Sequence, residues 1–315
     1  MKRLRTFYLL PLALAAVLTG CSSSDDESVP APRPVRLTVS SCSMAETRAA
    51  DGLYTASTGF SGGEAVRIYM KDAGDARSAV YVVGSPTDGK SPLTVSTGQT
   101  ALEYPEEADV TLYGIYPAAS ETAHVVRRDQ TSTTDGNANY QLSDLMYAVT
   151  AVPQAQQEEP QELTFNHQLV KLKVIVNKAA DLHQVTGLTL GNVLRKVPVT
   201  AVSGSGITLG TAVAAATSDP DYSTDAAVNN SILLGAEETA SDVAETYTYV
   251  CVFPAQAWAS TTTFLTVDVD DDQIAFSANK SFVGGTTYVA TLNIDASMLS
   301  AVGVSPLWAG PLATR

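Results

Sequence analysis

The segment Gly59-Phe60-Ser61-Gly62-Gly63 matches the G-x-S-x-G pattern that presents the nucleophilic serine of many hydrolases. Such a serine needs a strand before it and a helix after it, because that turn exposes the hydroxyl above a sheet. Here a loop rich in Thr and Gly precedes the pattern, and alternating apolar residues from Val66 to Met70 predict a strand after it. We therefore interpret Ser61 as a turn residue, and the sequence predicts no catalytic residue and no enzyme.

Asp268, Asp270 and Asp272 occupy alternate positions, as the first ligands of a calcium-binding loop do. However, Gln273 stands where that loop needs a glycine, and no glutamate follows at the required distance. An acidic turn between two strands is therefore favoured over a calcium site. The sequence also has no CxxC pair, no HExxH and no phosphate-binding glycine loop, so it predicts no metal ion and no cofactor.

Cys21 follows Leu18-Thr19-Gly20 at the end of an N-terminal leader. A basic start precedes an apolar run over residues 9–17, which is far shorter than the roughly 20 residues that a membrane-spanning helix needs. The ending resembles a bacterial lipobox, which predicts that residues 1–20 are removed and that Cys21 is lipidated. The alternative is a cleaved secretory signal with an incidental cysteine.

Residues 22–34 are rich in Ser, Asp, Glu and Pro, a composition that predicts a solvated tether. Its acidic run resembles the surface-export signal of Bacteroidetes lipoproteins, although a tether without any signal would look the same. The expected location is the outer membrane at the cell surface, reached through the periplasm and held by a lipid anchor.

The formal charge of the whole chain is −14 at pH 7. Without the three basic residues of the leader (Lys2, Arg3 and Arg5) the charge becomes −14 − 3 = −17. Nucleic-acid binding needs clustered Lys and Arg, so the sequence predicts no nucleic-acid partner.

Cys42 and Cys251 are the remaining cysteines. An oxidising surface location permits a disulfide between them. Cys251 also alternates with Tyr249 and Phe253 along a predicted strand, which favours a buried thiol that acts as a small apolar residue. Both interpretations remain open.

Short runs of alternating apolar and polar residues, separated by turn residues, fill most of the chain. In the first run the apolar positions are Val35, Leu37 and Val39. Further strands are predicted over 66–70, 79–83, 93–96, 110–116, 170–177, 188–190, 197–202, 207–209, 231–234, 246–253, 264–269, 274–276, 287–294 and 302–304. No segment sustains helical periodicity over three turns, so the predicted fold class is all-β, built as β-sandwiches.

A polar, proline-bracketed stretch over residues 153–162 suggests a domain boundary, although a long surface loop would look similar. The predicted organisation is a signal peptide (1–20), a lipidated leader with a tether and the first strand (21–48), an N-terminal sandwich (49–160) and a C-terminal sandwich (161–315). Residues 120–139 are expected to form an exposed loop.

Arg48 lies in Glu46-Thr47-Arg48-Ala49, between the first strand and a loop rich in Gly and Thr. Proteases cut backbone that is exposed and unpaired, so the Arg48–Ala49 bond is a candidate processing site. The alternative is an incidental surface arginine.

Several motifs in the same order resemble those of the fimbrillin (FimA/Mfa-like) lipoproteins of Bacteroidetes. They are the Leu-Thr-Gly-Cys ending, Glu46-Thr47-Arg48-Ala49, Phe60 with Gly63-Glu64, Asp144-Leu145-Met146-Tyr147-Ala148, Leu163-Thr164-Phe165-Asn166-His167-Gln168-Leu169-Val170-Lys171-Leu172, Gly285-Thr286-Thr287-Tyr288 and Trp308. Glu64 stands where the family usually has Asp. His167 in the longest motif is interpreted as a structural residue that hydrogen-bonds across the sandwich edge.

The resemblance implies two tandem transthyretin-like β-sandwich domains and a pilus subunit. It also implies that a trypsin-like protease cuts after Arg48 and that the first strand then leaves. A strand from another fimbrial subunit would fill the groove, because it restores both the hydrogen bonds and the buried apolar contacts. Our candidate donor strand contains Val302, Val304 and Leu307, although this tail also fits the last strand of the second domain.

A second function remains open, namely a glycan-binding surface lipoprotein that keeps its anchor. That function predicts a flat platform of exposed aromatic residues, for which only the tryptophans Trp258 and Trp308 are available. For a fimbrial subunit, the sequence leaves open a stalk, tip or anchor position and the host or bacterial ligand that it would adhere to.

Overall fold

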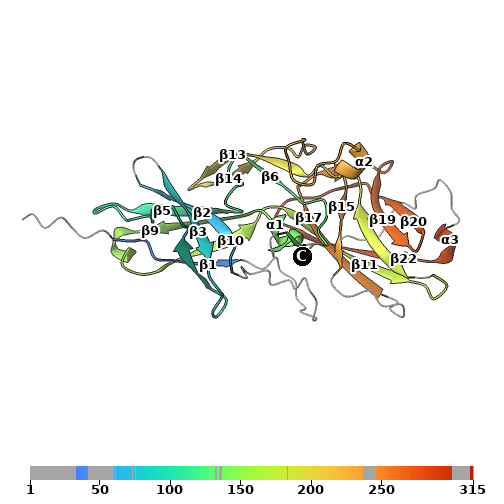
Figure 1. Cartoon of the computed structure of the whole chain (residues 1–315), viewed down its shortest axis with the longest axis horizontal. Coiled ribbons are helices and arrows are strands. Elements are labelled where there is room, and N and C mark those ends of the chain that lie inside the picture. The colour runs from blue at the N-terminus through green and yellow to red at the C-terminus, as the bar shows by residue number, and fades with distance from the viewer. Residues whose placement is uncertain are drawn as a thin grey trace, which may run out of the picture. The chain divides into compact units, whose positions relative to one another are not determined.

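A computed structural model of the chain is shown in Figure 1. It describes residues 33–41, 60, 62–72, 74, 76–131, 133–134, 137–182, 184–236, 246–299 and 313–314. The chain divides into two units, Met1–Ala31 and Pro32–Arg315, and the described residues all belong to the second. Strands dominate this part of the chain, which confirms the predicted all-β class.

Seven strands hydrogen-bond in a closed ring, in the order β1-β10-β9-β5-β2-β3-β4. Each presents alternate apolar residues to the interior; in β2, for example, Val66, Ile68 and Met70 are fully buried. The strands are β1 (Leu37–Ser41), β2 (Ala65–Lys71), β3 (Arg77–Val83), β4 (Ser91–Val95), β5 (Val110–Tyr116), β9 (Met146–Val152) and β10 (Gln161–His167).

Two further sheets share a second hydrophobic cluster. The five-stranded sheet contains β16 (Gly235–Ala236), β17 (Thr246–Phe253), β11 (Val170–Lys178), β22 (Thr287–Ile294) and β23 (Ala313–Thr314). The four-stranded sheet contains β15 (Ile232–Leu233), β12 (Val185–Leu190), β19 (Thr263–Val269) and β20 (Asp272–Ser277). Inward side chains of both sheets meet in one core, as in a β-sandwich.

Shorter elements connect these strands. They are β6 (Ala123–Val125), β7 (Thr133–Thr134), β8 (Asn137–Ala138), α1 (Asn139–Leu142), the 3-10 helix Gln154–Gln156, β13 (Lys196–Ser203), β14 (Gly206–Leu209), α2 (Ala226–Asn229), β18 (Ala257–Trp258), β21 (Lys280–Ser281) and α3 (Ala296–Leu299). Among the described residues, no helix has the length and apolar character that crossing a membrane requires.

The division between the two hydrophobic clusters does not fall after residue 160. β10 pairs with β1 and β9, and its Leu163 and Phe165 are buried in the cluster of the ring. Leu169 and the strand β11 belong to the second cluster. The proline-bracketed stretch therefore contains a surface turn. β10 and β11 belong to different clusters, and the second cluster also contains Ile115, Val126 and Leu145 from earlier in the chain.

Residues 120–139, expected as an exposed loop, instead contain buried polar side chains. β6 pairs with β13, and His124 is buried with Ser120 Oγ at 2.9 Å from Nδ1 and Ser143 O at 2.8 Å from Nε2. The fully buried Gln130 amide donates to Val252 O at 2.9 Å and accepts from Val252 N at 3.0 Å. The expectation of an exposed loop was wrong because these polar groups find their partners inside the protein.

Gly114 in β5 tests how tightly the ring is packed. A Cβ atom there would lie 2.8 Å from Phe165 Cζ and 2.9 Å from Ile68 Cδ1. We expect Gly114→Ala to lower the free energy of unfolding by about 1–3 kcal/mol, because overpacking strains a filled core. Gly191→Ala is the control, since its Cβ would meet nothing closer than 3.4 Å. Equal urea midpoints for the two variants would contradict this prediction.

The burial of His124 predicts that the free energy of unfolding depends on pH. Burial lowers the pKa of this imidazole below 6.5, so the unfolded chain takes up the proton first as the pH falls. The contribution of the neutral His124 to the free energy of unfolding is fully present above about pH 6.5, and it is lost as the pH falls below that value. Urea unfolding at pH 7.5 and 5.5 should show a smaller loss of stability for His124→Gln than for the unchanged chain. The same loss in both proteins would exclude His124 as the cause.

Candidate functional site

β1 is the strand that closes the ring. It pairs in parallel with β10, from Leu37 opposite Gln161 to Ser41 opposite Phe165, and antiparallel with β4. Figure 1 shows β1 beside β10. Removing β1 would therefore separate β10 from β4 and convert the ring into an open sheet.

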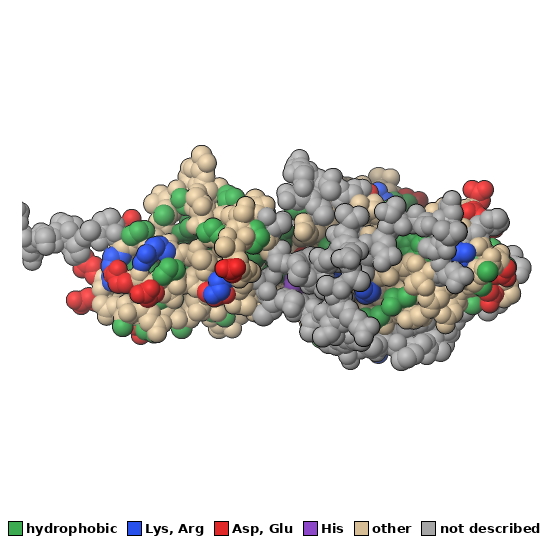
Figure 2. Space-filling model, turned by 90° about the horizontal axis from the view of Figure 1, so that it is seen from below, with side chains coloured by type: hydrophobic (Ala, Val, Ile, Leu, Met, Phe, Trp, Pro, Cys, Tyr) green, Lys and Arg blue, Asp and Glu red, His purple; other side chains and the backbone are tan. Residues whose placement is uncertain are grey.

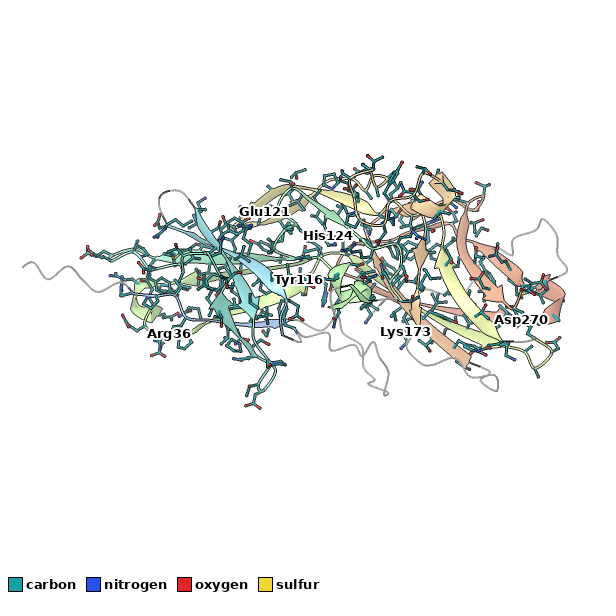
Figure 3. The ribbon with its side chains drawn as sticks, in the orientation of Figure 1. Arg36, Tyr116, Glu121, His124, Lys173 and Asp270 are labelled. Atoms are coloured by element: carbon teal, nitrogen blue, oxygen red, sulfur yellow. The ribbon has the colours of Figure 1, made fainter. Side chains whose placement is uncertain are left out.

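The buried face of β1, extended by Val35 just before it, carries the three apolar residues that the sequence predicts for a displaced strand. Val35, Leu37 and Val39 are 7%, 5% and 1% exposed, and all three belong to the hydrophobic cluster of the ring. Burying an aliphatic side chain contributes about 1.5–3 kcal/mol, so this face contributes several kcal/mol to holding the strand. The residues between them face outward, and Arg36 is exposed (Figure 3).

The pairing of β1 with β4 is short. It covers two residue pairs, Thr38 opposite Pro92 and Val39 opposite Ser91, whereas the pairing with β10 covers five. Proline has no N–H to donate, and the Pro92 carbonyl already accepts a hydrogen bond from Gly84 N at 2.8 Å on its other side. Of the two pairings of β1, the one with β4 is therefore the weaker.

The residues before β1 are held by a segment that the sequence did not identify. Val35 N donates to Leu102 O at 2.9 Å, and Tyr104 N donates to Arg33 O at 2.9 Å. The Arg33 guanidinium also donates to Glu106 O at 2.9 Å. The alternation of buried Leu102 and Tyr104 around exposed Glu103 is the signal that could have revealed this partner.

Polar contacts on the outer side of β1 contribute little free energy to holding the strand in the ring. Ser40 Oγ donates to Glu162 Oε1 at 2.8 Å, and Lys90 Nζ forms an ion pair with the same carboxylate. Hydrogen bonds from Lys90 and Ser40 lower the pKa of Glu162 below its usual value. These groups lie at the surface, where an ion pair contributes about 0–1 kcal/mol. Backbone pairing and apolar burial therefore hold β1.

The other predicted site residues lie outside the described residues. These are Cys21, Arg48, Ala49, Val302, Val304 and Leu307, together with Cys42. Of the C-terminal tail, the described part is β23, which pairs antiparallel with β22. Cys251 is a free, buried thiol in β17, and burial raises its pKa above the usual value. Its pairing with Cys42 stays a prediction.

The sequence motifs weighed for other chemistry are turns in the structure. The run containing Asp270 joins β19 to β20, and Gln273 Nε2 donates to Asp268 Oδ1 at 2.8 Å (Figure 3). No group of three metal-ligating side chains occurs among the described residues. Gly62 and Gly63 have φ of 103° and 95° and lead into β2 rather than a helix, as a turn requires.

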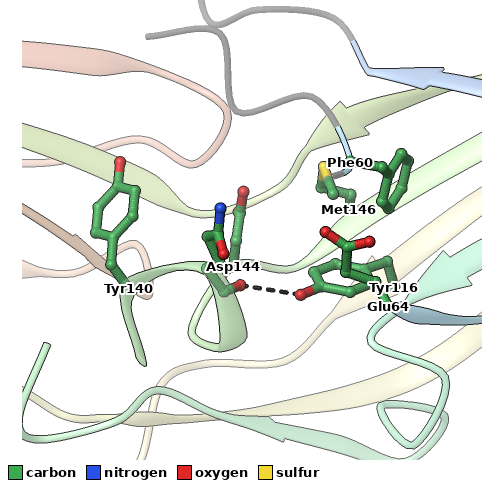
Figure 4. A pocket seen from close by; sticks show the side chains of 7 residues that line it. Phe60, Glu64, Tyr116, Tyr140, Asp144 and Met146 are labelled. Atoms are coloured by element: carbon green, nitrogen blue, oxygen red, sulfur yellow. Dashed lines mark hydrogen bonds between the residues drawn. The ribbon is translucent and has the colours of Figure 1, made fainter. Parts of the chain in front are cut away.

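A pocket lies where the loop before β2 approaches the start of β9 (Figure 4). The empty space there, which includes open solvent, is about 320 Å³. Its lining residues are Phe60, Glu64, Tyr116, Tyr140, Gln141, Asp144 and Met146. Behind it, His167 Nδ1 is hydrogen-bonded to Asp144 Oδ2, which joins the end of β10 to the residues before β9. This contact fits the structural role expected for His167.

Figure 2 shows one face of the molecule, where the described Lys and Arg side chains lie singly or beside acidic ones. They form no continuous basic patch on that face. Arg67 pairs with Glu121 at 3.0 Å, and Lys196 pairs with Asp219 at 3.0 Å. This distribution fits the acidic composition of the chain.

Comparisons with known proteins agree with this all-β architecture. The chain is similar to a candidate cell adhesion protein of Bacteroides uniformis, with a TM-score of 0.57 and 17% identity, over 91% of this chain and 97% of that one. It is also similar to a candidate cell adhesion protein of Bacteroides ovatus, with a TM-score of 0.52 and 14% identity, over 86% of this chain and 95% of that one. At these identities the similarity shows a shared fold.

No curated protein matches the sequence. The family model described as fimbrillin-like matches residues 47–305, which is most of the chain. The chain therefore belongs to the fimbrillin-like family, a family of structural proteins rather than enzymes, which supports the role of a fimbrial subunit in a cell-surface appendage.

Proposed function

We propose that this protein is the precursor of a fimbrial subunit that polymerises by donor-strand exchange after proteolysis. The single observation that carries the proposal is the position of β1, which closes the ring through backbone pairing and one apolar face. A strand held in this way can be replaced by another strand of similar alternation.

The proposed sequence of events begins with lipidation of Cys21, export of the lipoprotein through the periplasm and anchoring in the outer membrane. A trypsin-like protease then cuts after Arg48, so that β1 is no longer covalently linked to the ring. β1 can then separate first from β4, where the pairing is shortest and contains Pro92. The open groove between β4 and β10 exposes unpaired backbone groups and an apolar floor, which favours binding of a new strand.

A strand donated by another subunit would occupy this groove. We keep the tail containing Val302, Val304 and Leu307 as the candidate donor. Insertion of a tail into the groove of a different copy is a head-to-tail contact that does not close on itself, so it produces a filament. The partners are therefore other fimbrial subunits and the protease, and adhesion would follow from the assembled fimbria.

A glycan-binding lipoprotein is not favoured by any described residue. Trp258 is 3% exposed, and its Nε1 donates to Gly191 O at 2.8 Å. Its ring packs edge-on against Phe253, Phe264 and Phe282 in the second cluster. A buried ring of this kind stabilises the core and cannot form a flat platform for a sugar.

Cutting at Arg48 tests the proposal directly. We expect mild trypsin to convert the mature chain into a product that begins at Ala49 and forms ladders on a gel without denaturant. Arg48→Ala should block both changes, whereas Arg48→Lys should restore them because trypsin also cuts after Lys. Intact-mass spectrometry identifies the new N-terminus. A chain that resists cutting at Arg48 and stays monomeric would contradict the proposal.

Cutting without ladder formation would separate the two steps, because it would reject strand exchange while leaving the processing site in place. The same experiment tests the disulfide. If Cys42 and Cys251 are bonded, the leader will remain attached to the cut chain until a reductant is added.

Release of β1 provides a second test. In the chain cut after Arg48, Leu37→Ala should speed dissociation of the leader by about tenfold or more, because replacing a buried Leu by Ala costs about 2–5 kcal/mol. Thr38→Ala is the matched control on the outward face and should change the rate little. A fluorophore attached to the leader reports dissociation. Equal rates for the two variants would show that apolar burial does not hold the strand.

A further inference from the structure

The pocket beside the start of β9 carries a buried carboxylate oxygen whose hydrogen bonding is incomplete. Asp144 is 7% exposed, and its Oδ2 is hydrogen-bonded to His167 Nδ1. Its Oδ1 is also buried, and no described protein group donates a hydrogen bond to it. Buried acceptors of this kind are rare, because leaving a charged group without a donor costs free energy. The observation therefore points to a ligand that supplies a donor.

The described lining of the pocket is acidic. Glu64, which is 8% exposed, contributes a second carboxylate to the wall, and the described lining residues include no Lys or Arg. Burial raises the pKa of the Tyr116 phenol above its usual value, and the charges of Asp144 and Glu64 raise it further. The charges of Asp144 and Glu64 therefore create a negative potential in the pocket beside Tyr116, and a negative potential attracts a cation.

The remaining walls favour an organic cation over a metal ion. Phe60, Tyr116 and Tyr140 bring three aromatic rings to the lining, and the faces of aromatic rings attract ammonium groups. Hard metal ions instead need about six oxygen ligands, whereas the described residues contain no group of three metal-ligating side chains. The empty space of about 320 Å³ includes open solvent, so the enclosed part suits a compact head group of about the size of an ammonium, with the rest of the ligand extending outward.

The acceptors match the three N–H donors of a primary ammonium. Asp144 Oδ1 is one of them, and the Glu64 carboxylate, whose Oε2 also accepts from Gly62 N at 2.7 Å, is the second. The Tyr116 hydroxyl oxygen is the third. That hydroxyl donates to Gln141 O at 3.2 Å, so its lone pairs remain able to accept (Figure 4). A guanidinium group has five donors in a fixed plane and would leave some of them without acceptors here.

We propose that this pocket binds a primary ammonium group, carried by a lysine side chain of another protein or by a small alkylamine. Asp144 and Glu64 neutralise and orient the ammonium group, while the aromatic rings of Phe60, Tyr116 and Tyr140 surround its aliphatic carbons. The site goes beyond subunit assembly and does not require cleavage at Arg48. The test of ligand binding is therefore independent of the test of strand exchange, and either can fail without the other.

The first experiment compares three probes on the uncut mature chain at constant ionic strength, by isothermal titration calorimetry and ligand-observed NMR. We expect n-butylammonium to bind saturably and n-butanol, its neutral analogue, to bind at least about tenfold more weakly, since charge-assisted hydrogen bonds are the stronger ones. The third probe, Nα-acetyl-lysine amide, separates the sources. Tighter binding of this probe than of n-butylammonium indicates a lysine side chain, and weaker binding indicates a free amine.

Variants of the pocket provide the second experiment. Asp144→Asn should weaken n-butylammonium binding by about tenfold or more, because it removes a charged acceptor. Asp270→Asn is the matched control: it removes the same charge at an exposed turn, where a φ of 52° suits asparagine equally well. Glu64→Gln serves if loss of the His167 contact prevents Asp144→Asn from folding, as judged by its thermal melt.

Three results would overturn the proposal. They are the absence of saturable n-butylammonium binding to the unchanged chain, equal binding of n-butanol, and an affinity in the folded pocket variants that equals that of Asp270→Asn.

Discussion

The ring of seven strands depends on a five-residue strand whose partners lie far away in the sequence. β1 joins β10 along its whole length, but it joins β4 at only two positions, one of which is a proline. The apolar face of Val35, Leu37 and Val39 supplies the free energy that this short pairing lacks. The side chains of β1 are thus buried as those of a core strand are, whereas one side of its backbone is paired at only two positions. A strand with both properties is suited to replacement by another strand.

The sequence predicted the limits of a strand best where its apolar residues alternate strongly and turn residues stand at both ends. The predicted limits of β5, β17 and β22 coincide with the observed ones, because turn residues bound a strong apolar alternation in each. β10 was not among the predicted strands, and periodicity says only which face of a strand is buried, not against which sheet it packs. Its pairing with β1, in which Leu37 lies opposite Gln161 (161 − 37 = 124 residues apart), could therefore not be predicted from the alternation of either strand.

Buried polar groups explain why the rest could not be predicted. His124, Gln130 and Arg195 appear in polar stretches, yet each is buried and hydrogen-bonded to backbone carbonyls of other segments. Of the candidate site, the apolar face of β1 was predictable from its alternation. The pocket around Asp144 was not, because its chemistry arises only when distant segments meet. The alternation of Leu102 and Tyr104 indicates a buried face but does not say which segment it pairs with.

The parallel pairing of β1 with β10 also constrains the order in which the chain folds. Residues 37–41 are synthesised long before residues 161–165, so the first strand must wait until about half of the chain has been made. During that interval β2, β3 and β4 can pair with one another through local contacts, while the edge of β4 stays uncovered. Closure of the ring is consequently a late, high-contact-order event. A newly made chain therefore passes through an open form before the ring closes.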